Sequence, residues 1–85
     1  MPEGKDIDAA AWPAFLELLV ETRTRANLTR AGLAALAGVT QPYVSQVEAG
    51  KIRLDALQLR RWLPACGSDL GKFGRALERR LVDVE

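Results

Sequence analysis

Hydrophobic residues recur along this chain at intervals of three and four, which is the spacing of one face of an α-helix. The first stripe lies between residues 12 and 23 and consists of Trp12, Phe15, Leu16, Leu19, Val20 and Arg23. Pro13 is expected early in this helix, where a missing N–H is harmless, and the helix is expected to end near Asn27. We expect residues 1–9 to form a flexible N-terminal tip and residues 10–85 to form a single domain.

Two short helices are predicted next, over residues 30–37 and 41–48. Thr29 and Thr40 are suitable N-caps for them, and Gly38 supplies a left-handed residue between them. The apolar faces consist of Leu33, Leu36 and Ala37 in the first helix and Val44 and Val47 in the second. Pro42 falls in the first turn of the second helix, where proline is tolerated.

Two further helices are predicted in the C-terminal third of the chain. One follows Asp55 as its cap and ends at Gly67, with Pro64 expected to kink or shorten it. Its inward residues are expected to be Ala56, Leu59, Trp62, Leu63 and Cys66. The other covers about residues 69–83, after a cap at Ser68 or Asp69. Its stripe, Leu70, Phe73, Leu77, Leu81 and in addition Val84, is interpreted either as core or as a dimer interface. The whole pattern predicts an all-α, compact five-helix fold.

The outer side of the predicted helix 41–48 is polar. It carries Gln41, Tyr43, Ser45 and Gln46. A helix fits the major groove of DNA, and such side chains can meet base edges there. The pair of helices around Gly38 therefore predicts a helix-turn-helix unit over about residues 29–48. The alternative is that these are ordinary exposed polar residues.

The chain resembles the Cro/repressor, or Xre-like, helix-turn-helix family. The resemblance lies in Leu33-Ala34, Gly38-Val39-Thr40 and the spacing S-x-x-E-x-G formed by Ser45, Glu48 and Gly50, and it extends more weakly from about Phe15 to Leu81. Two features depart from the family pattern: residues 51–54 lack a proline, and Pro64 interrupts the fourth helix.

The resemblance implies a lambda-repressor-like domain that acts as a transcriptional repressor or autoregulator, as a dimer on a palindromic operator. It implies base contacts from Gln41, Pro42, Tyr43, Ser45 and Gln46. It also implies a structural ion pair between Arg23 and Glu48. If dimerisation uses the last helix, its contacts would come from Leu70, Phe73, Leu77 and Leu81.

Charge is distributed unevenly along the chain, although the net formal charge is only +1. Residues 1–22 hold one basic and five acidic residues, residues 23–61 seven basic and two acidic, and residues 62–85 four of each. The basic segment coincides with the helix-turn-helix unit, as expected of a surface that binds nucleic acid. Candidate phosphate contacts are Arg30, Thr40, Lys51, Arg53, Arg60 and Arg61. The last two are expected near the beginning of the fourth helix, and solubility alone explains them equally well.

Several function classes are disfavoured. The 85 residues suffice for one small core, so a homodimer is expected to add stability. The chain has no histidine and a single cysteine, Cys66, so a zinc site, an internal disulfide and common catalytic centres are not expected. No cofactor is expected. No apolar run is long enough to span a membrane, and the acidic N-terminus is unlike a signal peptide, so a cytoplasmic location is expected.

The sequence therefore predicts a non-enzymatic, sequence-specific regulator whose partner is double-stranded DNA. An alternative is an antitoxin or adaptor that binds a partner protein, with or without DNA. Such a protein would use the stripe of the last helix or the acidic N-terminus.

Overall fold

The computed structural model describes the backbone of residues 2–84 and the side chains of residue 9 and of residues 11–82. This part of the chain forms five α-helices and one 3₁₀ helix, without strands. They are α1 (Pro2–Arg25), α2 (Arg30–Ala37), α3 (Gln41–Glu48), α4 (Ala56–Trp62), η1 (Leu63–Cys66) and α5 (Leu70–Val84). The predicted all-α, five-helix fold is confirmed. None of the described helices has the length and apolar character needed to cross a membrane.

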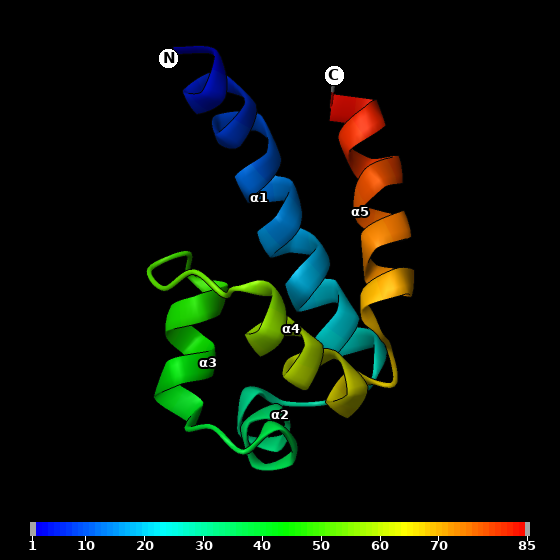
Figure 1. Cartoon of the computed structure of the whole chain (residues 1–85). Coiled ribbons are helices and arrows are strands. Elements are labelled where there is room, and N and C mark those ends of the chain that lie inside the picture. Colours follow the sequence, from blue (N-terminus) through cyan, green and yellow to red (C-terminus); the bar gives the residue numbers. More distant parts are fainter. Residues whose placement is uncertain (1, 85) are drawn as a thin grey trace.

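Helices α1 and α5 run antiparallel and side by side, while α2, α3 and α4 gather around the end of α1 (Figure 1). The α1–α5 contact is partly aromatic, because Phe73 meets Phe15 edge-on with 5.6 Å between ring centroids. It is also ionic, because Arg80 Nη2 donates to Glu21 Oε2 at 2.9 Å. This hydrogen bond holds the pKa of Glu21 below its usual range.

The core is assembled from all the helices. Its largest fully buried side chains are Leu19, Leu33, Val44, Val47, Trp62 and Leu63. Because α1, α2, α3 and the α4–η1 segment each contribute at least one of them, the short helices are held by tertiary packing as well as by their caps.

The caps of α2 and α3 agree with the sequence prediction. The Thr29 hydroxyl accepts a hydrogen bond from the Gly32 N–H at 2.9 Å, and the Thr40 hydroxyl accepts one from the Tyr43 N–H at 3.3 Å. Gly38 ends α2 in the left-handed region with φ 74°. The two threonine caps and Gly38 therefore lie at the helix boundaries that the sequence predicts.

The start of α1 differs from the prediction. The helix begins at Pro2, so Pro13 lies inside it rather than in its first turn. The alanines at residues 9–11 are the strongest helix formers and carry the helix back beyond Pro13. Pro13 has no N–H, which leaves the Ala9 carbonyl without its helical donor. That residues 1–9 form a flexible tip stays a prediction.

Pro64 was expected to kink or to shorten the fourth helix, and the structure shows that α4 is shortened. The α-helix ends at Trp62, and residues 63–66 continue as the 3₁₀ helix η1 up to Gly67, whose φ is 71°. At the other end, Asp55 and Gln58 form a reciprocal capping box. Ala56 is exposed and does not point inward, which corrects the sequence prediction, because it lies in the first turn on the outer side of the helix.

Asp69 is the cap of α5, since its carboxylate accepts the Lys72 N–H at 2.9 Å. The apolar stripe of this helix divides into two parts. Phe73 is 4% exposed and belongs to the core, so its prediction as a dimer contact is wrong: it faces Phe15 of α1 inside the protomer. Leu77 and Leu81 are half-buried, and Leu70 is exposed. The side chain of Val84 lies outside the described residues.

Candidate nucleic-acid interface

Helix α3 is fixed to the domain by one side and leaves the other accessible. Val44 and Val47 are 0% and 1% exposed and pack into the core. On the other side, Pro42 and Gln46 are exposed and Ser45 is half-buried, and Gln41 is exposed at the first position of the helix. Two amide side chains, each with a donor and an acceptor, are thus accessible on a helix anchored underneath by valines.

Tyr43 is less free than its neighbours in α3. Its ring is half-buried and meets Trp62 of α4 at an angle of 61°, with 6.2 Å between the centroids. It also lines an open groove of about 650 Å³ between the α2–α3 turn and α4, and this groove is bordered by Arg60 and Arg61 as well. Tyr43 therefore combines packing against α4 with an edge that faces solvent.

The basic residues predicted as phosphate contacts are distributed over several elements. Lys51 and Arg53 are exposed immediately after α3, and the Arg53 guanidinium lies 4.3 Å from the centroid of the Trp12 ring. Arg60 and Arg61 are exposed, but they occupy the last turn of α4 and not its beginning. The reason for this correction is that Pro64 ends the α-helix earlier than its apolar stripe suggested.

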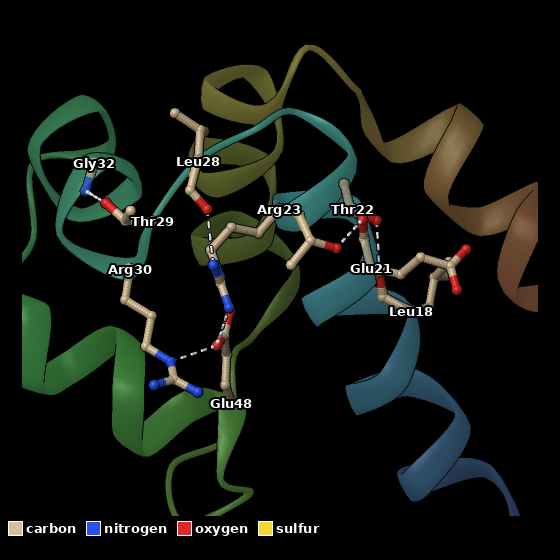
Figure 2. Close-up of polar contacts among 10 residues, drawn as sticks. Leu18, Glu21, Thr22, Arg23, Leu28, Thr29, Arg30, Gly32 and Glu48 are labelled. Carbon is tan, nitrogen blue, oxygen red and sulfur yellow. Dashed lines mark hydrogen bonds and ion pairs between the residues drawn. The ribbon is translucent and has the colours of Figure 1, made fainter.

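Arg23, Arg30 and Glu48 meet where α1, α2 and α3 converge (Figure 2). Arg23 Nε lies 2.7 Å from Glu48 Oε2, and Arg23 Nη2 lies 3.2 Å from Glu48 Oε1. The Arg23 and Glu48 side chains are only 10% and 2% exposed. The structure thus brings together the two residues that the family resemblance pairs, and it buries them.

Sequence reasoning missed two contacts of these arginines. Arg23 Nη1 donates to the Leu28 carbonyl at 2.8 Å, which ties the end of α1 to the segment that leads into α2. Arg30 Nε donates to Glu48 Oε1 at 3.0 Å. No helical spacing relates Arg30 to Glu48, because they are 18 residues apart on different helices. The one signal that could have indicated these contacts was the expected Arg23–Glu48 pair, because it brings the end of α3 toward α1.

A family model described as a helix-turn-helix domain matches residues 14–79, well over half of the chain. The chain matched no curated protein and no solved structure. The matched range contains all of α2, α3 and α4, which together form the surface described above. This protein therefore belongs to the helix-turn-helix domain family, of the Cro/Xre type that its sequence resembles.

Proposed function

We propose that this protein is a sequence-specific transcriptional regulator that acts as a repressor or autoregulator by occupying an operator. The observation that carries the proposal is the exposed side of α3, where Gln46 lies away from the buried Val44 and Val47 and Gln41 is exposed at the first position of the helix. Such a helix can enter a major groove without rearranging the core beneath it.

Each group of residues has a separate role in this proposal. The glutamine amides read base edges, and adenine is the base whose N6 and N7 match a donor and an acceptor together. Pro42 offers a thymine methyl an apolar contact, and Ser45 and the edge of Tyr43 complete the reading surface. Basic groups on neighbouring elements hold phosphates and set the register of α3. Repression then requires occupancy alone, without an enzymatic step or a cofactor.

Binding as a homodimer to a palindromic operator is part of the proposal. Two copies would place two α3 helices in successive major grooves, about 34 Å apart along the DNA. The exposed side chain of Leu70 and the half-buried Leu77 and Leu81 on α5 are available for contact between copies. A regulator that binds DNA in this way would act in the cytoplasm.

Selection of binding sites from a random duplex library tests the proposal. A recovered palindrome with half-sites about one helical turn apart is expected. Light scattering of the complex should give two protomers per duplex. A protein that enriches no sequence and is captured instead with a stoichiometric partner protein would refute the proposal and favour the antitoxin or adaptor role.

Substitution of Gln46 separates base reading from general affinity. Gln46→Ala should weaken binding to the selected operator by about 1–3 kcal/mol per half-site, because each protomer loses one bidentate base contact. Binding to random duplex and the melting temperature should stay nearly unchanged, since Gln46 is exposed. Both duplexes are titrated by fluorescence anisotropy at the same salt concentration. An equal loss on both would show that Gln46 does not read bases.

A further inference from the structure

The Glu48 carboxylate accepts hydrogen bonds from two arginines that belong to different helices. Arg23 of α1 donates through Nε and Nη2, and Arg30 of α2 donates through Nε at 3.0 Å. The two arginines differ in their environment: the Arg23 side chain is 10% exposed, while that of Arg30 is 52% exposed. One buried carboxylate therefore connects a buried guanidinium to one that faces solvent.

The position of this carboxylate is fixed by its contacts with Arg23. Arg23 holds both Glu48 oxygens, and its Nη1 in turn donates to the Leu28 carbonyl at 2.8 Å. Rotation of the Glu48 side chain would break these contacts inside the domain, where unpaired charges are costly. Glu48 is therefore a rigid acceptor for Arg30.

The geometry leaves the outer donors of Arg30 available. Only Nε contacts Glu48, and among the described residues neither Nη atom of Arg30 has a hydrogen-bond partner. In Figure 2 the Nη atoms of Arg30 lie on the side away from Arg23. Because a guanidinium is planar, fixing Nε restricts the plane in which the two Nη groups lie.

The surroundings of Arg30 suit a phosphate. Arg30 is the first residue of α2, next to the Thr29 cap, and the first turn of this helix has no acidic residue. The N-terminus of a helix favours an anion through its free N–H groups and its dipole. Two arginines and one carboxylate also leave a formal charge of +1 on the cluster.

We propose that Glu48 is a positioning residue for DNA binding, which holds the Arg30 guanidinium oriented for a phosphate of the duplex. This inference rests on the proposed function and assigns Glu48 a role beyond the ion pair with Arg23. A guanidinium that is already ordered loses less conformational freedom on binding than a free one. The orientation of Arg30, and not its charge alone, therefore contributes to affinity.

Charge-conserving substitutions test this inference. Arg30→Lys keeps the charge but loses the planar set of donors, so it should weaken binding about tenfold, close to the effect of Arg30→Ala. Arg79→Lys is the matched control, because Arg79 is an exposed arginine of α5, outside the proposed DNA-binding surface, for which the described residues offer no ion-pair partner, and it should change the affinity less than about twofold. Wild-type affinity in Arg30→Lys would overturn the inference.

A double-mutant cycle tests the role of Glu48. Glu48→Gln keeps one acceptor oxygen and should weaken DNA binding when Arg30 is present, but not further in the Arg30→Ala background. Binding is measured below the melting temperature of every variant, as checked by circular dichroism. Additive losses would overturn the positioning role. If Glu48→Gln does not fold, the comparison of Arg30→Lys with Arg79→Lys decides.

The choice of duplex separates this inference from the proposed function. All variants are titrated against a random-sequence duplex as well as any selected operator. Binding of random duplex without an enriched sequence would refute sequence-specific regulation, while the Arg30 and Glu48 series would still report on phosphate contact. Absence of binding to any duplex by the wild-type protein at low salt would refute both.

Discussion

The buried ion pair between Arg23 and Glu48 predicts that Glu48→Ala destabilises the fold strongly. Truncation removes the acceptor of two Arg23 donors and leaves that guanidinium with the Leu28 carbonyl as its remaining partner. The Glu48 side chain is 2% exposed, so water can do little to replace it. Breaking a buried pair from one side costs about 3–5 kcal/mol, whereas an exposed pair contributes about 0–1 kcal/mol.

This loss is large for a domain of this size. Native domains are stable by about 0.05–0.15 kcal/mol per residue, which gives about 4–13 kcal/mol for 85 residues. Because about 1 kcal/mol shifts the melting temperature of a small domain by roughly 4–8 °C, Glu48→Ala should lower it by at least about 12 °C. Urea and thermal unfolding followed by circular dichroism measure both quantities. A loss of unfolding free energy below about 1 kcal/mol would refute the reasoning.

A double substitution distinguishes an unpaired buried charge from a loss of packing. If the cost of Glu48→Ala comes from stranding the Arg23 guanidinium, Arg23→Met combined with Glu48→Leu should be more stable than either single substitution. Additive destabilisation would instead show that the two side chains matter mainly through their packing.

Two further predictions concern particular residues. Gly38 and Gly50 both have positive φ, but an added Cβ meets nothing within 4 Å at Gly38 and lies 3.0 Å from Leu16 Cδ1 at Gly50. Gly38→Ala should therefore lower the free energy of unfolding by about 1–2 kcal/mol through backbone strain, and Gly50→Ala should lower it by more. Urea unfolding measures both losses, and a larger loss for Gly38→Ala than for Gly50→Ala would contradict the prediction. Burial raises the pKa of the Cys66 thiol, so at pH 8 the folded protein holds less thiolate than the unfolded chain. Alkylation by iodoacetamide, followed by mass spectrometry, should be slower in buffer than in urea, and equal rates would contradict it.

Local chemistry made the central part of the fold predictable. Thr29, Gly38 and Thr40 each act on backbone groups within a few residues, so the bounds of α2 and α3 follow from the sequence. The valines of α3 show helical spacing, which predicts its buried side and therefore its free side. Exposure of Gln46 follows from that assignment, whereas Gln41, three residues before Val44, is exposed at the first position of the helix.

Other features depend on contacts that no local pattern specifies. The spacing of Phe73 and Leu77 marks an apolar stripe but does not say whether another helix of the same chain covers it. In the structure α1 covers Phe73. The contact between Arg30 and Glu48 needs the arrangement of three helices. Pro13 is a residue for which a local rule predicted the wrong position. Its lack of an N–H predicted a place early in the helix, but Pro13 lies inside α1.

The antiparallel arrangement of α1 and α5 has a practical consequence for engineering. The beginning of α1 and the end of α5 lie at the same end of the molecule, away from the α2–α3 turn (Figure 1). A fluorescent protein, an affinity tag or an effector domain fused at either end would emerge away from the α2–α3 turn. Two different modules could also be attached together, one at each end, and would be held close to one another.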